Sequence, residues 1–349
     1  MTIRKEGSAI RVTPEAVTWA FRLFLGREPN DAAEISTHLP HGSLDSLRLA
    51  FAEMPEFQSF YDTVVKHRKP RFGLQPFLLR PPAPSVPWHF APPSMEKPVS
   101  QLCTAAQFEE PAFKQILQAM AMLPRLHRGV WQHVYVVSVL ATLGCIAPGR
   151  SALGLGVRRE RIPALLASRG VAVVAIADPG RVPEQEARGG LHLFHPEVVH
   201  LEDFEALVHY HEADLRDPRA DLGAGYDAVW SCALAQHMGS VERVLGFLER
   251  SLDVLKPGGV AVHTFDFNIS SDDQTVDRAD FAIPRRRDME ALALRLKRAG
   301  HEMLPLNLHP GHDTADGVVD VPPYGLPHLK IEVGEHVVTS LGLAIRKGR

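Results

Sequence analysis

The feature that most constrains this fold is a regular alternation of short apolar stretches with amphipathic ones between residues 151 and 267. Stretches of strand length occur at 151–156, 171–177, 207–213, 226–231 and 260–267. Helical periodicity separates several of them, at 160–169 and at 240–255. Apolar strands that alternate with helices predict a doubly wound, mostly parallel sheet covered on both faces. The ligand crevice of such an α/β sheet lies at the carboxyl ends of its strands.

The residues before this region predict a separate helical part. Residues 13–66 show helical periodicity after Thr13 and Pro14, which combine a capping hydroxyl with a proline preset for the first turn. Residues 76–98 are rich in proline, which excludes an interior helix or strand and is typical of a semi-extended linker. Trp88 and Phe90 within it are expected to dock on a neighbouring surface.

The residues after the alternation predict the far edge of the sheet. Two late apolar stretches, 303–308 and 337–345, are expected to pair antiparallel as a terminal hairpin. The predicted organisation is therefore a small all-α domain (1–70), a Pro-rich linker (71–100) and an α/β domain (101–349).

Composition excludes several classes of protein. The net charge is -3 and 45% of the residues are hydrophobic. These values are typical of a globular protein and unlike those of a nucleic-acid-binding one. Cys103, Cys145 and Cys232 are widely spaced without a CxxC pair, which argues against a disulfide framework and favours a reducing compartment. The N-terminus has no apolar signal core and no run is long enough for a membrane span. A cytoplasmic location is expected.

Glycines follow the first strand of the alternation. Gly154 and Gly156 form a Gly-x-Gly turn that leads through Val157 and Arg158 to the predicted helix at 160–169. Glycine lets the backbone turn tightly and approach a ligand, and a helix N-terminus offers free N–H groups. Dinucleotide-binding enzymes share such a turn, and it also occurs as a purely structural feature.

Carboxylates follow the next two strands. Asp178 comes directly after the 171–177 stretch, where a carboxylate can accept the ribose hydroxyls of a nucleoside cofactor. Asp214, followed by Leu215, comes after the third stretch, where a carboxylate can accept a hydrogen bond from an adenine amino group. An ordinary turn aspartate and an exposed loop acid are the alternatives.

The most specific pattern lies in the second half of the alternation. The sequence YDAVWS, residues 226–231, is followed by Ala235, Gln236 and His237, then by a long helical stretch and by LKPGGVAV at 255–262. The order of these features, after the Gly-x-Gly turn and the two acids, resembles class I S-adenosylmethionine-dependent methyltransferases. The resemblance covers about residues 125–349 and implies a Rossmann-like domain.

This resemblance implies a set of binding residues. S-adenosylmethionine would contact Gly154, Gly156, Val157, Arg158, Asp178, Asp214, Leu215 and Ser231. The chain resembles in particular a bacterial subgroup associated with surface-glycan genes, which has a tryptophan-containing helix before the first strand and a threonine-acid-Phe-Asn strand end. Trp131 and Asn268 are therefore expected to contact substrate. The sequence LGREP at 25–29 resembles a helical module found beside glycosyltransferases, which implies a glycan context.

The predicted reaction is methyl transfer to a hydroxyl or amine of a sugar, a glycan precursor or another small molecule. Such an acceptor needs a base, for which His237 is the first candidate and Asp266 the second. The sequence leaves open whether the protein forms a homo-oligomer. No metal site is predicted, although His309, His312 and Asp313 form a close group in the sequence.

The same sequence leaves two other functions open. Arg158 stands where the family has a third glycine, Ala177 where it has an acid, and Gln236 where a glutamate is common. These departures favour a non-catalytic scaffold that keeps the fold with a degraded cofactor site. A nicotinamide-dependent enzyme is a third hypothesis, since the Gly-x-Gly turn permits it while the LKPGG sequence argues against it.

Overall fold

The computed structural model describes residues 11–61, 69–178, 188–217 and 220–349. The chain divides into two compact units, 1–70 and 71–349, which are described separately. The first unit contains α1 (Pro14–Ala20), η1 (Phe21–Leu25), α2 (Ala32–His38), α3 (Leu44–Ala52) and α4 (Pro55–Phe60). Its core is made of Val12, Val17, Ala20, Phe21, Leu47 and Phe51. The predicted start of α1 is confirmed, because the Thr13 hydroxyl accepts a hydrogen bond from the Ala16 N–H at 3.2 Å.

The LGREP sequence has a structural role within this first unit. Gly26 adopts a left-handed conformation with φ of 68°, which ends η1. The guanidinium of Arg27 then pairs with Glu34 of α2 and with Glu56 of α4, each at 3.0 Å. One arginine thus ties two helices to the turn that precedes them.

The Pro-rich stretch is part of the second unit and contributes to its core. It is mostly extended, as predicted, but Leu78, Val86 and Met95 are buried and α5 (Pro76–Leu79) forms a short helix that begins on a proline. The Trp88 side chain packs against the core of the second unit, as predicted, and its backbone pairs with Leu306 in an isolated parallel β-bridge.

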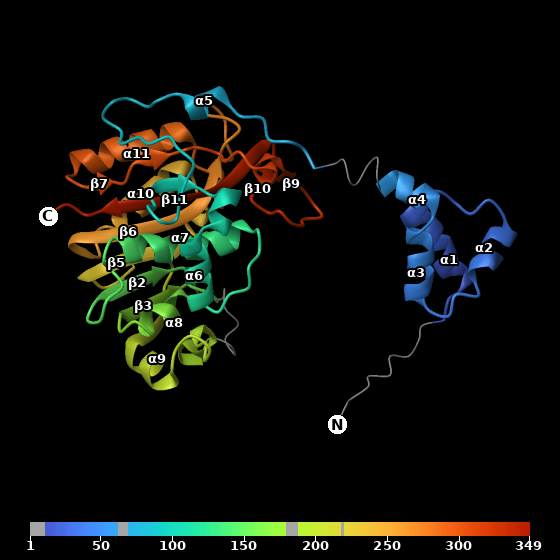
Figure 1. Ribbon diagram of the computed structural model, residues 1–349, viewed down its shortest axis with the longest axis horizontal. Helices are drawn as coiled ribbons and strands as arrows, with labels where there is room; N and C mark the ends of the chain where they lie inside the picture. The colour runs from blue at the N-terminus through green and yellow to red at the C-terminus, as the bar shows by residue number, and fades with distance from the viewer. Residues whose placement is uncertain (1–10, 62–68, 179–187, 218–219) are drawn as a thin grey trace. The chain divides into compact units, whose positions relative to one another are not determined.

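A doubly wound α/β sheet forms the second unit (Figure 1). Within the described residues its strands run in the order β4-β3-β2-β5-β6-β11-β1-β8. Their bounds are β1 (Ser100–Leu102), β2 (Ser151–Leu155), β3 (Ala172–Ala177), β4 (Val208–Glu212), β5 (Tyr226–Cys232), β6 (Leu255–Asn268), β8 (Leu306–Asn307) and β11 (His336–Arg346). Strands β2 to β6 pair in parallel, as predicted. The order reverses between β2 and β5, and the carboxyl edge at that switch point is where open α/β sheets bind ligands.

Helices cover both faces of the sheet (Figure 1). One core contains side chains of α6 (Pro111–Ala119), α7 (Arg128–Thr142), α8 (Ile162–Ala167) and α9 (Leu201–Leu207). The other contains side chains of α10 (Val241–Arg250) and α11 (Arg286–Arg298). Short helical turns complete the chain: η3 (Ala105–Glu109), η4 (Arg188–Leu193), η5 (Ala235–His237) and η6 (Thr314–Gly317). No helix in the described ranges has the length and apolar character that a membrane crossing requires.

The antiparallel edge differs in detail from the predicted hairpin. The stretch at 303–308 divides into β7 (Glu302–Met303), which pairs with β11, and β8, which pairs with β1. The hairpin itself joins β10 (Lys330–Val333) to β11, and β9 (Val319–Asp320) pairs with β10. Pro305 lies at the point where the late stretch divides, and proline removes the N–H that a continuous ladder needs.

Candidate functional site

The Gly-x-Gly turn lies at the carboxyl end of β2 and is closely packed. A Cβ at Gly154 would lie 2.4 Å from Trp230 Cζ2, on the neighbouring strand β5. Gly156 has φ of 71°, and a Cβ there would lie 2.8 Å from a methyl group of Leu234. Glycine is therefore needed at both positions for the chain's own packing, whether or not a ligand approaches.

The residues after the turn differ from the prediction in their local structure. Helix α8 begins at Ile162 and has six residues, so its N-terminus does not follow the glycines directly. The buried Val157 donates its N–H to the Ile176 carbonyl at 3.0 Å. Arg158 is exposed. The backbone here extends the pairing of β2 with β3 instead of opening into a helix N-terminus.

The two predicted carboxylates lie in different surroundings at adjacent strand ends. Asp178 is buried, and its Oδ1 accepts the Leu215 N–H at 3.4 Å. Asp214 is exposed and accepts a hydrogen bond from the Arg216 N–H at 3.0 Å. The structure therefore brings Asp178 and Leu215 together beside the glycine turn.

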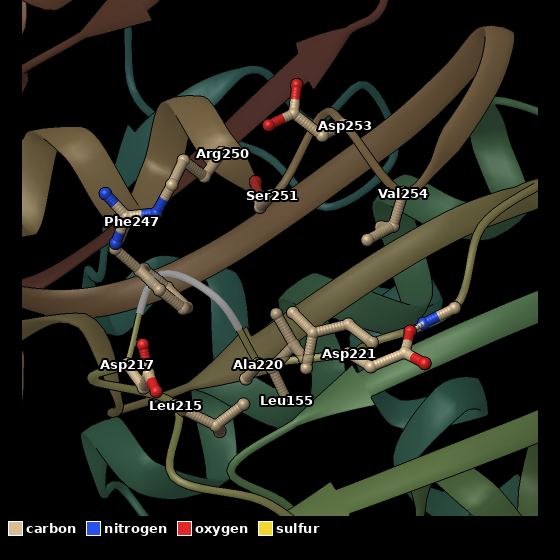
Figure 2. A pocket seen from close by; sticks show the side chains of 12 residues that line it. Leu155, Leu215, Asp217, Ala220, Asp221, Phe247, Arg250, Ser251, Asp253 and Val254 are labelled. Carbon is tan, nitrogen blue, oxygen red and sulfur yellow. Dashed lines mark hydrogen bonds between the residues drawn. The ribbon is translucent and has the colours of Figure 1, made fainter.

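A cavity of about 240 Å³ opens next to these residues (Figure 2). Leu155 and Leu215 contribute apolar side chains, and Phe247 and Arg250 of α10 close the opposite wall. Asp217, Asp221 and Asp253 also line it. The lining residues Leu222, Gly223 and Val254 precede β5 and β6, so the cavity extends along the α10 face from the end of β2 toward the amino ends of those two strands.

Ser231 belongs to a buried hydrogen-bonded row of three side chains, Ser231, His263 and Ser251. Its hydroxyl is 2.8 Å from His263 Nδ1, and the hydroxyl of Ser251 is 2.8 Å from His263 Nε2. Ser251 donates its own hydrogen to the Leu248 carbonyl, so it accepts from Nε2–H and leaves Nδ1 to accept from Ser231. Ser231 and His263 are fully buried. The geometry gives Ser231 a partner within the core.

Burial lowers the pKa of His263 to about 3. An unfolded histidine has a pKa near 6.5, so between about pH 6.5 and pH 3 the unfolded chain binds one proton more than the folded chain does. We expect this group's stabilising contribution to be complete above pH 6.5 and to fall by about 1.4 kcal/mol per pH unit below it. Urea unfolding at pH 7, 6 and 5 should show a shallower pH dependence for His263→Gln, which keeps hydrogen-bonding atoms without the titration. Equal slopes for the two proteins would contradict this.

Two predicted substrate contacts are placed inside the protein. Trp131 is fully buried and donates its Nε1–H to Gln107 Oε1 at 2.7 Å. Asn268 is also buried, and its side chain organises the following turn: Oδ1 accepts the Ser270 N–H at 2.9 Å and Nδ2 donates to the Gln274 carbonyl at 3.0 Å. Both side chains have structural partners in this geometry.

Polar side chains gather beyond the carboxyl end of β6. Asp266 is buried and forms an ion pair with Arg128, the first residue of α7. The Arg128 N–H donates to the His328 carbonyl at 2.9 Å, and the His328 ring stacks on His127 with centroids 4.5 Å apart. His328 Nδ1 lies 2.5 Å from the carboxylate of the fully buried Asp320.

The Asp320–His328 pair has the arrangement of an oriented base. A buried carboxylate on one ring nitrogen fixes the tautomer and leaves the other nitrogen for proton transfer. Sequence reasoning missed this pair, since an aspartate and a histidine eight positions apart carry no recognised motif. The only sequence signal was the number of histidines, 18 in all.

The predicted base His237 lies at the end of η5, after the carboxyl end of β5. Its ring is partly exposed and packs against Phe281, with centroids 5.3 Å apart. It therefore stands on the same edge of the sheet as the glycine turn.

Among known proteins, the chain is similar to solved structures, and to these alone. No protein-family model and no curated protein sequence matches the chain. A 1,6-didemethyltoxoflavin-N1-methyltransferase from Burkholderia thailandensis, solved with S-adenosylhomocysteine, is 16% identical, with 69% of this chain and 80% of that chain covered and a TM-score of 0.37. An S-adenosylmethionine-dependent methyltransferase from Clostridium acetobutylicum is 11% identical, with coverage of 62% and 91% and a TM-score of 0.37. Similarity at this level leaves the function to be argued from the chain's own residues.

Proposed function

We propose that the protein is an S-adenosylmethionine-dependent methyltransferase acting on a hydroxyl or amine of a small molecule. The observation that carries the proposal is the switch point between β2 and β5, with the glycine turn at the end of β2 and a buried Asp178 at the end of β3. The motif order that resembles class I methyltransferases falls on these same strand ends.

The described residues fit a nucleoside ligand in two respects. The buried Asp178 carboxylate lies at the carboxyl end of β3, where α/β folds of this type place an acid that binds a ribose diol. The cavity beside Leu155 and Leu215 is apolar within and concave, which suits an adenine ring. When bound, the sulfonium cofactor would supply an electrophilic methyl group.

The chain's own residues would handle the acceptor and its proton. A hydroxyl or amine that accepted the methyl group would give up a proton, which a base of the protein must take up. We assign this base to His328, oriented by Asp320, and keep His237 as the second candidate. Asp266 is paired with Arg128, so in this proposal it positions α7 instead of accepting the proton.

The acceptor class is proposed from the sequence. The LGREP-like module and the surface-glycan subgroup favour a sugar or glycan precursor over other small molecules. The groups at the end of β6 include Arg128, His127 and His328, which together offer charged and neutral hydrogen-bonding partners for hydroxyl groups.

Calorimetric titration with S-adenosylhomocysteine tests the proposal. We expect saturable binding to the full chain, and about tenfold or weaker affinity for Asp178→Asn, because a ribose acceptor is lost. Asp203→Asn, an exposed substitution on α9, is the matched control and should bind as the unmodified protein does. Absence of binding at millimolar ligand would reject the proposal.

A non-catalytic scaffold is the second candidate, and a specific observation favours it. Leu234 lies against Gly156 and Trp230 against Gly154, so the chain itself occupies space beside both glycines. Absent binding would support this candidate, whereas a weak affinity that strengthens in Leu234→Ala would show that a competent site is partly covered.

A further inference from the structure

Three side chains that bind metals in other proteins converge near the switch point. His133 comes from the middle of α7, Glu160 from the segment between β2 and α8, and Cys232 from the carboxyl end of β5. One potential ligand atom of each lies within 4.8 Å of the other two. Among the described residues this is the group that meets that criterion, and His309, His312 and Asp313 do not form such a set.

The cluster is enclosed by protein. Glu160 and Cys232 are buried, and His133 is mostly so. The Trp230 indole donates its Nε1–H to Glu160 Oε1 at 2.9 Å, which fixes the orientation of the carboxyl group. The Arg158 backbone N–H also donates to Glu160, and the Arg158 charge acts on the same carboxyl group.

One buried polar atom at this place lacks a partner. His133 Nδ1 is buried without a hydrogen-bond partner among the residues that are described, whereas the Thr264 hydroxyl lies within hydrogen-bonding reach of the Cys232 thiol. Thr264 lies directly opposite Cys232 in the pairing of β5 with β6. A buried ring nitrogen without a partner, next to a buried carboxyl group and a buried thiol, indicates room for a further partner at this place.

The three potential ligand atoms indicate which metal ion would suit the cluster. One sulfur, one imidazole nitrogen and one carboxylate oxygen suit Zn²⁺, whereas Mg²⁺ and Ca²⁺ prefer oxygen ligands throughout. Ligand atoms around a tetrahedral zinc ion lie about 3.5 Å apart, whereas those of the cluster lie within 4.8 Å of one another, so binding would draw the three side chains closer together. Three protein ligands leave a fourth position open, as in catalytic zinc sites.

We propose that His133, Glu160 and Cys232 form a zinc-binding site with one open coordination position. The Trp230–Glu160 hydrogen bond and the Thr264 hydroxyl beside Cys232 would act as the outer partners that orient the ligands. The site lies on the edge of the sheet where this fold class places its ligands. It does not depend on the proposed methyl transfer.

Burial disfavours the charged form of each of the three groups. It raises the pKa of Glu160 to about 7, raises the pKa of the Cys232 thiol well above its usual value, and lowers the pKa of His133 to about 4. A neutral imidazole is already the ligating form, while zinc would displace the protons of the carboxyl group and the thiol.

The test uses the full chain, stripped with a chelator and then titrated with Zn²⁺ or Co²⁺. We expect one equivalent of metal by elemental analysis and, with Co²⁺, a sulfur-to-metal charge-transfer band together with the visible bands of tetrahedral cobalt. Both should persist in Cys103→Ala/Cys145→Ala, in which Cys232 is the only thiol left. If that double variant does not fold, the two single variants serve in its place.

Variants of the ligands and a matched control complete the test. Cys232→Ser and Glu160→Gln should each weaken Co²⁺ binding at least tenfold, and Cys232→Ser should remove the charge-transfer band. His312 is an exposed loop histidine outside the cluster, so His312→Gln should bind metal as the unmodified protein does. Failure of the unmodified protein to bind beyond nonspecific levels, or loss of the band in the thiol variant that keeps Cys232 and remains folded, would overturn the proposal.

Discussion

Replacing His328 with glutamine is expected to lower the rate of methyl transfer about 10²- to 10⁴-fold, the usual contribution of a positioned base. Affinity for S-adenosylhomocysteine should stay unchanged, because His328 lies beside Arg128, which pairs with Asp266 of β6, whereas the proposed cofactor contacts lie at the ends of β2 and β3. The measurement is the rate of S-adenosylhomocysteine release from S-adenosylmethionine with a panel of sugars and amino sugars as acceptors.

Asp320 and His237 provide the comparisons that identify the base. Asp320→Asn should reduce turnover as well, since an amide no longer fixes the tautomer of His328. Nitrogen chemical shifts of the His328 ring would report that tautomer directly. A larger loss of rate in His237→Gln than in His328→Gln would move the assignment to His237.

Gly342→Ala is expected to destabilise the second unit by about 3 kcal/mol, at the upper end of the range for overpacking a core. A Cβ at this position in β11 would lie 2.2 Å from the Tyr135 ring. That ring cannot move aside easily, because it stacks on Trp131 at 4.9 Å and its hydroxyl donates to the Val99 carbonyl at 2.7 Å. Urea unfolding followed by circular dichroism measures the loss.

Gly246→Ala is the matched control for this substitution. Gly246 lies within α10, where an added Cβ meets only the far end of the Arg250 side chain at 3.1 Å. Alanine should therefore leave stability unchanged or raise it by up to about 1 kcal/mol through helix propensity. Adding Tyr135→Leu to Gly342→Ala should recover part of the loss, because the two substitutions act on one contact. Equal stability of Gly342→Ala and the unmodified protein would refute the packing argument.

The sequence predicted the arrangement of the α/β unit well because its signals are local. The apolar stretches at 171–177 and 226–231 are β3 and β5, with ends that shift by a residue. The late stretch at 303–308 was predicted less well. Its division into β7 and β8 depends on which strands lie beside it, and periodicity within one stretch carries no such information.

The candidate site was predictable only in part. The positions of Gly154, Gly156 and Asp178 at the ends of β2 and β3 follow from motif spacing, since parallel strands share an edge. The surroundings of Trp131 and Asn268 did not follow, because a side chain's partners depend on segments far away in the sequence.

The sequence alone determined the type and order of the elements, through hydrophobic periodicity, capping residues and glycine or proline breaks. Only the tertiary structure decided which polar side chains meet. It placed Asp320 against His328, and His133 beside Glu160 and Cys232. The physical reason is that backbone geometry imposes a period that any short stretch displays, whereas contacts between distant residues arise from packing the whole chain around one core.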